Sequence, residues 1–432
     1  MKEAFMRVLR CFPSLLFPLV GVVILLSSCV SSIGFAQPLE SVGRVSLDKI
    51  LFAFVANPWS SDSPFARDSY LVLIDEEFKA TVFQTDFSEA SHLVWGKAGM
   101  YLADSSNDYL IDHDGRVHVK KAKKGTIANG AAFLAHGTAV VSVTNEGFTD
   151  SGYRQHVALL NSESTDLRTI GKYTDVFSVC GNSAYVLGGE LSKLQDEEIE
   201  RERIFLQQVV KDSVFEYREI RRVSADLHEV IYAGPTAPCD GRNIFVLADQ
   251  VEYLPEEKKR LGDPGEFPQF QKDSPLTQFE PGSHSYASIE RWNVQTGQRD
   301  VIPLRSDDGE FFRVASDEIS NASYGVGSYF DGKLRWISGG GILYSTDVAT
   351  GVTSPIHGIK FPNAFENNRY AIFSQERVDV LTHAPYSEEP VEIFSYDIAS
   401  GHLLSHRKVD GLWGDIDYRT QIIRGFAVNP TT

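Results

Sequence analysis

The 432-residue sequence is short of positive charge and of methionine. Its 41 Lys and Arg residues stand against 58 Asp and Glu, which gives a formal net charge of −17. A surface this acidic repels phosphate backbones, so we do not expect the protein to bind nucleic acid. Only 3 methionines occur beside 34 glycines. That balance favours a turn-rich β protein over a helical one.

Long apolar runs are also missing, except near the N-terminus. Residues 11–26, "CFPSLLFPLVGVVILL", are nearly all apolar but fall short of the about 20 residues that a membrane-spanning helix needs. A basic segment with Lys2, Arg7 and Arg10 precedes the run, and small residues follow it. Because this order is typical of a secretory signal, we expect residues 1–28 to be a signal peptide.

The next residues resemble the lipobox of bacterial lipoproteins. Residues 26–29 are "LSSC", an aliphatic residue, two small residues and a cysteine. In that family the cysteine sulfur receives diacylglycerol and becomes the first residue of the mature protein. The resemblance implies a lipidated Cys29, attachment to a membrane through that lipid, and an extracytoplasmic place in the bacterial cell envelope. Two alternatives stay open: ordinary cleavage after "GFA" (34–36), or an uncleaved anchor that extends to Ala36.

Residues 29–42 have no periodicity and are expected to tether a folded domain at 43–432. In that domain a strand, a polar turn and a second strand recur, often with Asp or Asn before the turn and Gly after it. A second unit, a short strand followed by an apolar strand, alternates with the first. The first unit occurs at residues 71–83, 109–121, 158–170, 221–233, 290–302, 344–356 and 394–406, and examples of the second are 92–104, 132–144, 176–189, 236–249 and 364–375.

Four short strands repeated about seven times predict an all-β fold, a closed β-propeller of about seven blades, with six or eight left open. The last stretch, 417–429, is expected to pair with the first blade and close the ring. The turns "DVATG" and "DIASG" resemble the blade ends of quinoprotein-type propellers, and "YVLGG" and "WISGG" resemble kelch repeats. No complete motif assigns a particular propeller family. One stretch, 191–210, is predicted to be a surface helix.

Two cysteines remain in the predicted domain after the signal. Cys180 and Cys239 occupy matching positions in neighbouring repeats, at the end of the inner strand. Adjacent blades would bring them together, so we predict a disulfide in the exported protein. Two buried free thiols are the alternative. A metal pair is not supported, because no other ligand stands at a suitable spacing.

Four long inserts, 56–68, 190–215, 249–285 and 375–391, fall between the second and third strands of their blades. In a propeller these links open on one face, and uneven inserts gathered there are typical of a binding face. Alternatively, their rings pack the inserts onto their own blades. The aromatic candidates for contact with a partner are Trp59, Phe65, Tyr253, Phe267, Phe270 and Tyr386.

These features favour a binding or assembly module for an extracytoplasmic protein or glycan. The alternative is a hydrolase or lyase that acts on cell-envelope carbohydrate or peptide, which needs carboxylates converging on one cavity. The candidates near inner strands are Asp175, Asp240, Asp317 and Glu366. The "DHDG" at 112–115 resembles the start of a calcium loop, but the continuation of such a loop fails, and the chemistry of a hairpin turn explains the stretch better. We expect no cofactor and no metal.

Replacing Cys29 tests the lipobox. Cys29→Ala removes the sulfur that would carry the lipid, so the protein should leave the membrane fraction or accumulate as an unprocessed precursor. Fractionation with mass spectrometry of the N-terminal peptide measures both outcomes. A Cys29→Ala product that is still processed and still lipidated would contradict the assignment.

Overall fold

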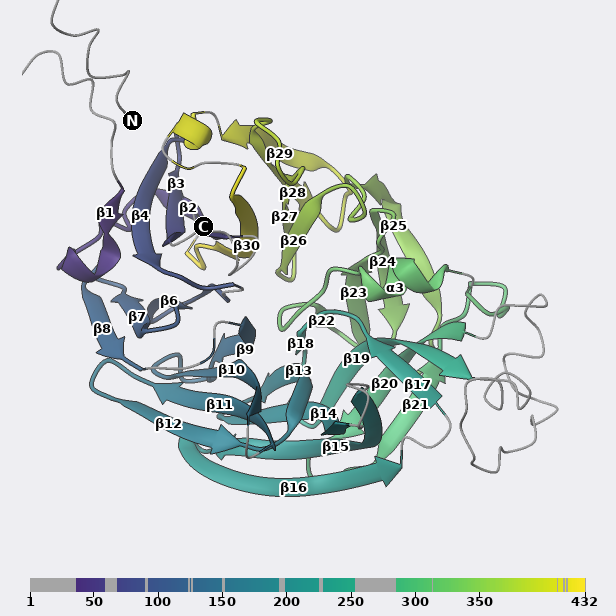
Figure 1. Cartoon of the computed structure of the whole chain (residues 1–432). Helices are drawn as coiled ribbons and strands as arrows, with labels where there is room; N and C mark the ends of the chain where they lie inside the picture. The colour runs from purple at the N-terminus through teal and green to yellow at the C-terminus, as the bar shows by residue number, and fades with distance from the viewer. Residues whose placement is uncertain are drawn as a thin grey trace, which may run out of the picture. The chain divides into compact units, whose positions relative to one another are not determined.

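Seven antiparallel β-sheets arranged in a ring make up residues 37–432 of the computed structural model (Figure 1). The predicted all-β propeller and its count of seven blades are confirmed. In the part of the chain that the structure describes, no helix has the length and apolarity needed to span a membrane. The described residues are 36–58, 68–89, 92–122, 125, 127–149, 152–193, 199–224, 228–252, 285–312, 314–409, 411–414, 416 and 419–431.

Each blade has four strands, which we call A to D from the centre of the ring outward. Blade 1 consists of β30 (Gln421–Val428), β2 (Ile50–Pro58), β3 (Asp68–Asp75) and β4 (Ala80–Asp86). Blade 2 consists of β5 (Val94–Gly96), β6 (Gly99–Ala103), β7 (Asn107–Asp112) and β8 (Val117–Lys121). Blade 3 consists of β9 (Ile127–Phe133), β10 (Val140–Thr149), β11 (Gly152–Leu160) and β12 (Thr165–Ile170).

Blade 4 consists of β13 (Tyr173–Cys180), β14 (Ser183–Lys193), β15 (Ile199–Lys211) and β16 (Val214–Ser224). Blade 5 consists of β17 (His228–Tyr232), β19 (Asn243–Glu252), β20 (Ser285–Asn293) and β21 (Arg299–Pro303). Blade 6 consists of β22 (Tyr329–Phe330), β23 (Lys333–Ile337), β24 (Ile342–Asp347) and β25 (Thr353–Lys360). Blade 7 consists of β26 (Asn368–Phe373), β27 (Arg377–His383), β28 (Val391–Asp397) and β29 (Leu403–Val409).

Within the described residues, five short elements lie outside the four-stranded blades. The strand β1 (Gln37–Pro38) pairs in parallel with the outer edge of β4, and β18 (Thr236–Ala237) pairs in parallel with the inner strand β13 of the neighbouring blade. One helical turn, α3 (Ser316–Ser320), and two 3-10 turns, η1 (Leu39–Ser41) and η3 (Leu412–Gly414), complete the described elements.

The hairpin turns follow the predicted chemistry. In blade 6, the Asp347 carboxylate accepts hydrogen bonds from the backbone N–H groups of Ala349 (3.0 Å) and Thr350 (2.8 Å). Gly351 then adopts a φ of +78°, where a Cβ atom would stand 2.1 Å from the Pro303 carbonyl oxygen. An aspartate and a glycine at this spacing therefore fix both the turn and its close approach to the next blade.

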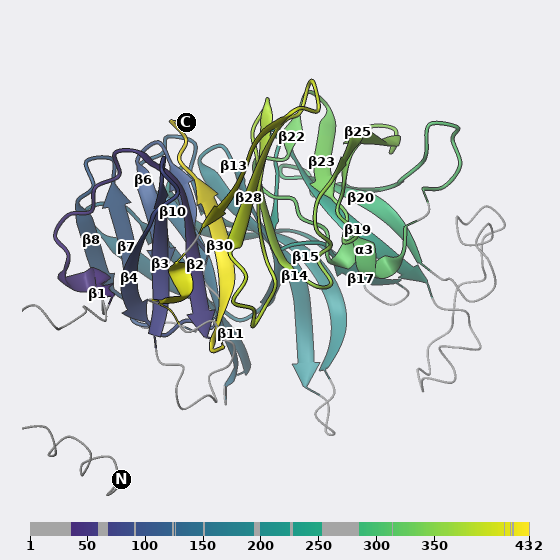
Figure 2. The ribbon, with the colours of Figure 1, turned by 90° about the horizontal axis from the view of Figure 1, so that it is seen from above.

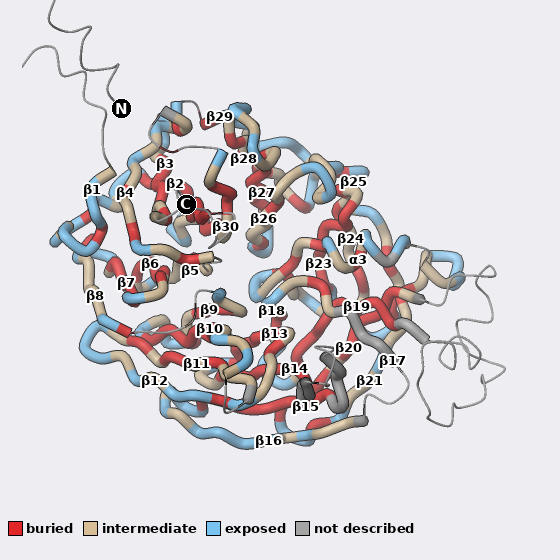
Figure 3. Tube along the Cα trace, viewed as in Figure 1, coloured by how far each residue is buried: buried red, intermediate tan, exposed pale blue. Residues whose placement is uncertain are grey.

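The hydrophobic core lies between the blades. Every pair of neighbouring blades shares a cluster of buried apolar side chains, and buried segments run through all seven sheets in Figure 3. Trp292 and Trp336, both 0% exposed, belong to the cluster that joins blades 4, 5 and 6. The core is thus distributed around the ring, so its stability depends on the ring being closed.

The C-terminal strand closes the ring, as predicted. β30 pairs antiparallel with β2, in a register that runs from Phe52 opposite Val428 to Pro58 opposite Gln421. The inner strand of blade 1 therefore comes from the end of the chain and its other three strands from the beginning. This arrangement leaves no gap between the first and last blades.

The predicted helix at 191–210 is wrong. Residues 191–193 belong to β14 and residues 199–210 to β15, and these strands pair over ten positions from Ala184 opposite Val210 to Lys193 opposite Ile199. In Figure 2 these two strands project beyond the neighbouring blades. Charged residues such as those at 200–203 resemble a solvated helix face, but pairing with both β14 and β16 decides the conformation.

Residues 37–42, within the range expected to be a tether, contact the first blade. Leu39 is 0% exposed and packs in the apolar cluster between blades 1 and 2. Its neighbours on the chain, Gln37 and Pro38, are the two residues of β1 that pair with β4. These contacts cover part of an outer sheet edge that would otherwise be open for pairing.

Cys180 and Cys239 form a disulfide, as predicted, with their Cα atoms 5.4 Å apart. Cys180 ends β13 of blade 4, and Cys239 forms an isolated bridge with Ile244 of blade 5. The bond therefore joins two neighbouring blades at the inner side of the ring, near β18.

Removing this disulfide should destabilise the protein. The bond closes a loop with a sequence separation of 59 residues, for which chain-entropy arguments give a contribution of about 4 kcal/mol. We expect the double variant Cys180→Ser/Cys239→Ser to unfold at a lower urea concentration than the oxidised protein. Reductant should lower the midpoint of the original protein and leave the variant unchanged. Equal midpoints for the oxidised protein and the variant would contradict this contribution.

Candidate functional site

A cavity of about 500 Å³ lies among the inner strands of the ring. Residues from six of the seven blades line it, so it occupies the central channel of the propeller. The side chains with hydrogen-bonding or charged groups are His92, Thr236, Ser323, Tyr324, Ser328, Arg369, Tyr370 and Arg424, and several glycines, among them Gly325 and Gly327, complete the wall.

The cavity reaches the end of the channel where the inner strands begin and extends along them to Phe373, the last residue of β26. His92 stands just before β5, residues 322–328 precede β22, and Arg369 is the second residue of β26. In the blade order A to D, the links from strand D to the next strand A and from B to C lie at this end. The predicted inserts 56–68 and 249–285 follow β2 and β19, and the links after β14 and β27 also join strands B and C. The cavity therefore reaches the end of the propeller that carries the B–C links.

Arg369 is buried in the cavity wall, and each nitrogen of its guanidinium donates at least one hydrogen bond. Its side chain is 7% exposed and donates hydrogen bonds to the Ser323 hydroxyl (3.2 Å) and to several backbone carbonyls of blade 6 and its links. Burial lowers the pKa of this guanidinium to about 10, and the charge of Glu318 opposes the shift. Arg369 is thus a tie between blades 6 and 7. The carbonyl acceptors belong to Asn321 (3.3 Å), Ile337 (3.4 Å), Ser338 (2.6 Å), Gly339 (3.4 Å) and Pro362 (3.2 Å).

Arg424 lies at a bulge in β30. Phe54 pairs with Phe426 and Val55 with Arg424, so Gly425 is an extra residue in the strand, with a φ of +69°. The bulge breaks the alternation of side chains: Ile423 and Phe426 pack in the same apolar cluster, although they are three positions apart. Arg424 is left to line the cavity. Bulges of this kind re-aim single side chains and are frequent next to functional sites.

Tyr370 stands beside Arg424. Its hydroxyl donates to the Ile423 carbonyl (3.0 Å), and burial raises its pKa while the Arg424 guanidinium opposes the rise. Tyr386, in the B–C link of blade 7, is 44% exposed; burial raises the pKa of its phenol, and the Arg424 charge opposes this rise as well. Arg424 therefore acts electrostatically on a residue of a B–C link.

Tyr386 is the only aromatic candidate within the described residues. Trp59, Phe65, Tyr253, Phe267 and Phe270 lie outside them, and their role stays a prediction. The strand bounds place the inserts 56–68 and 249–285 between strands B and C, as predicted. The insert 190–215 instead consists largely of β14 and β15, and the insert 375–391 contains all of β27, so that only residues 384–390 link strands B and C of blade 7.

The acidic candidates do not gather at the cavity. Asp240 accepts hydrogen bonds from the backbone of Arg242 (2.7 Å) and Asn243 (2.6 Å) in a hairpin turn. Asp317 is the second residue of the helical turn α3, and Glu366 sits in a turn capped by Asn363. Asp175 lies in β13, and among the described residues that line the cavity there is no carboxylate.

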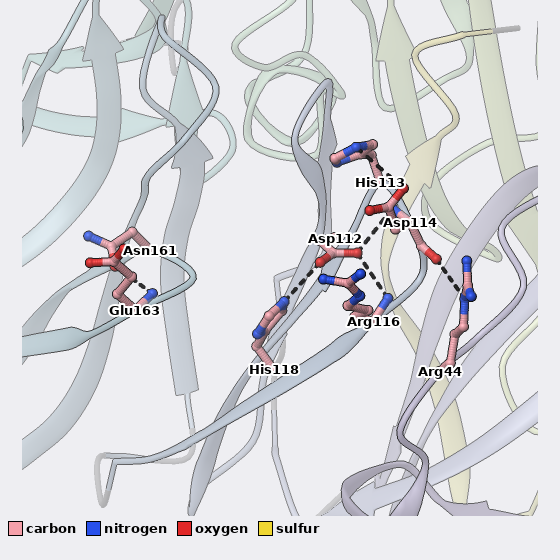
Figure 4. A network of polar contacts seen from close by, with 8 residues as sticks. All are labelled: Arg44, Asp112, His113, Asp114, Arg116, His118, Asn161 and Glu163. Carbon is pink, nitrogen blue, oxygen red and sulfur yellow. Dashed lines mark hydrogen bonds and ion pairs between the residues drawn. The ribbon is translucent and has the colours of Figure 1, made fainter.

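The "DHDG" stretch is a hairpin turn of blade 2 (Figure 4). Asp112 accepts hydrogen bonds from the backbone of Asp114 (3.0 Å) and Arg116 (2.9 Å), and it contacts His118 Nε2 at 2.9 Å. Gly115 has a φ of +80°, and a Cβ atom there would meet the Val45 carbonyl oxygen at 1.9 Å. Turn chemistry accounts for these residues, and no metal-binding group of His, Cys, Asp or Glu occurs in the described ranges.

The sequence analysis missed Arg369, Tyr370, Arg424 and His92. The signal that was present is an arginine inside an otherwise apolar inner strand, in "NRYAIF" and in "QIIRGFAV", where a glycine follows directly. An arginine and a glycine in such a strand indicate a bulge or a special contact. No local pattern, however, shows that these strands meet in one channel.

Comparisons with known proteins agree with the architecture. A family model described as "YycP, beta-propeller domain" matches residues 48–260, which is less than half of the chain. A comparison with curated proteins finds no match. The match defines the chain's class, a β-propeller similar to the YycP domain over those residues.

Solved structures give distant likenesses only. A protein from Lactobacillus plantarum is 12% identical, with 88% of this chain and 99% of that chain covered and a TM-score of 0.42. The β-propeller domain of the Trilobed protease from Pyrococcus furiosus is 10% identical (83% and 98% covered, TM-score 0.44). BamB from Moraxella catarrhalis is 10% identical (73% and 87% covered, TM-score 0.35). Likenesses at this level carry no argument about function.

Protonation of the cavity should be visible in the stability of the protein. Burial lowers the pKa of His92 to about 4, although a hydrogen bond to the Ala128 backbone opposes the shift. The unfolded chain takes up this proton below about pH 6.5 and the folded protein only near pH 4, so stability should fall as the pH decreases through this window. Because His92 is only partly shielded from solvent, we expect a loss of about 2 kcal/mol.

Urea unfolding at pH 6.5 and pH 4.5 measures this loss. His92→Gln should reduce the difference between the two pH values, because glutamine retains a donor and does not titrate. His136→Gln, at an exposed position, is the matched control and should leave the difference unchanged. The same pH dependence in both variants would show that His92 is not its source.

Proposed function

We propose that this protein is an exported, lipid-anchored binding module that captures an extracytoplasmic protein or glycan at the end of the propeller bearing the B–C links. One observation carries the proposal: a cavity of about 500 Å³ in the central channel reaches that same end, where the charge of Arg424 acts on Tyr386 of a B–C link. A concave site with a few polar groups beside variable loops suits recognition of a partner.

Exposed apolar side chains add to the support. Val326 (43% exposed) and Phe365 (50%) stand in D–A links, and Tyr386 (44%) in a B–C link. All three positions belong to the cavity end of the propeller. Large apolar side chains at the rim of a concave site are suited to contact with a partner.

Export and lipidation are part of the proposal and rest on residues 1–29, which lie outside the described residues. The disulfide between Cys180 and Cys239 accords with an oxidising compartment. Lipidation of Cys29 would hold the propeller at a membrane of the bacterial cell envelope through the segment that ends at β1.

The buried carboxylates favour this function over a hydrolase or lyase. Burial raises the pKa of Asp104 and of Asp379, but both lie within blades and have structural partners. Asp104 accepts from Tyr109 (2.8 Å), and Asp379 pairs with Arg377 (2.8 Å). Glu290, which is 0% exposed, pairs with Arg299 and accepts from Trp292 (2.8 Å). Such acids stabilise the blades and do not face the cavity.

Crosslinked capture from native membranes tests the proposed face. The bait is the full-length protein, compared with Phe365→Ser/Tyr386→Ser at the cavity end. The matched control is Val214→Ser/Leu404→Ser, which changes two exposed apolar residues (64% and 57%) near C–D turns at the opposite end. We expect one captured species to be lost with the first variant and kept with the control. Capture that both variants retain, or that only the control loses, would contradict the proposed face.

A further inference from the structure

We propose that the central cavity binds a carboxylate of an acidic sugar and that Arg424 is the residue that holds it. The inference rests on the proposed binding function and names the chemistry of its ligand. Four observations carry it: the unused donors of Arg424, the bulge that positions this side chain, the charge around the cavity, and the groups that face Arg424 across it.

Arg424 has hydrogen-bonding capacity that the described residues do not use. Its Nε atom is buried and has no hydrogen-bond partner among them, while the Tyr370 hydroxyl forms a side-chain hydrogen bond with the guanidinium. A guanidinium offers five N–H donors in a planar fork that matches the two oxygens of a carboxylate. An anion in the cavity would supply the acceptors that Arg424 lacks.

The bulge holds Arg424 in place before any ligand arrives. Ile423 and Phe426, 0% and 3% exposed, anchor β30 on both sides of the Arg424–Gly425 pair. The hydrogen bond from Tyr370 to the Ile423 carbonyl fixes the same segment from blade 7. Because the backbone is fixed on both sides, little ordering remains to be done on binding, which favours affinity.

The other charges around the cavity point to a single negative charge. Arg369 contributes positive charge, but its donors are engaged by blade 6 and Glu318 acts on it electrostatically. Only one guanidinium is therefore available to a ligand, in a chain with a formal net charge of −17. A carboxylate needs one such fork, whereas a doubly charged phosphate would be repelled more strongly.

The remaining lining suits a sugar ring. Burial keeps His92 neutral at pH 7, and the hydrogen bond to Ala128 leaves its second ring nitrogen to accept from a hydroxyl group. The rings of Tyr324 and Tyr370 supply flat apolar wall, and the cavity volume of about 500 Å³ fits a small ligand or the terminal residue of a larger one. A carboxylate that carries neighbouring hydroxyl groups, as in a uronic acid, satisfies both kinds of contact.

Calorimetric titration of the full-length protein in detergent tests the proposal, with glucuronate as the probe. Glucose is the neutral match, N-acetylglycine represents a peptide carboxylate, and inorganic phosphate represents a different anion. We expect glucuronate to bind at least about tenfold more tightly than glucose, since a charge-assisted hydrogen bond contributes about that factor. It should also bind more tightly than N-acetylglycine and phosphate, because these two anions lack the ring hydroxyl groups that the rest of the lining would contact. N-acetylglycine or phosphate binding as tightly as glucuronate would overturn the assignment to an acidic sugar.

Variants then locate the site. Arg424→Gln should weaken glucuronate binding by about tenfold or more, and Arg424→Lys should fall between this variant and the original protein because an ammonium group lacks the planar fork. The matched control is Arg335→Gln, since Arg335 donates to the Ser374 and Gln375 carbonyls away from the cavity. Circular dichroism and thermal melting establish that each variant is folded.

The outcomes separate this inference from the proposed function. Unchanged glucuronate affinity in folded Arg424→Gln, or no saturable binding by the original protein, would overturn the inference. In that case the proposed function would still stand if Phe365→Ser/Tyr386→Ser loses a partner that the full-length protein captures. If glucuronate still binds but the captured partner does not depend on Phe365 and Tyr386, the proposed partner face is rejected and the cavity site stands.

Discussion

The pairing of β30 with β2 is the interaction on which the rest of the molecule depends. It joins the two ends of the folded chain in one blade, and every interface between blades lies on a ring that this pairing closes. The same pairing contains the bulge at Gly425, which presents Arg424 to the central channel. Closure of the fold and construction of the site are thus the same structural event, although the residues involved are separated by most of the sequence.

Covalent and polar ties around the channel reinforce this closure. The disulfide joins blades 4 and 5, while Arg369 joins blades 6 and 7 through hydrogen bonds to backbone carbonyls. Both connections lie at the inner side of the ring, where strands are short and β22 has only two residues. Fixed walls at this point allow the cavity to keep its shape when no ligand is bound.

Much of the fold could be predicted from the sequence, because propeller blades repeat local patterns. Asp347 and Gly351 specify their turn by themselves, and repetition of that turn gave the blade count. Matching positions in neighbouring repeats were enough to predict the bond between Cys180 and Cys239. The helix prediction for residues 191–210 failed because their charges resemble a helix face. The pairing of β15 with β14 and β16 decides the conformation instead. The cavity could not be predicted, since Arg424, Arg369 and His92 come from three blades and meet only after the ring has closed.

Hydrogen exchange of β30 tests the central claim most directly. Backbone amides of residues 421–428 should exchange as slowly as those of residues 50–58, because the two strands share one ladder and open together. Mass spectrometry of peptides from the intact protein compares the two rates. Matched slow exchange is the predicted result. Rapid exchange in 421–428, with 50–58 still protected, would mean that the C-terminal strand does not close the ring and would contradict the account of both fold and site.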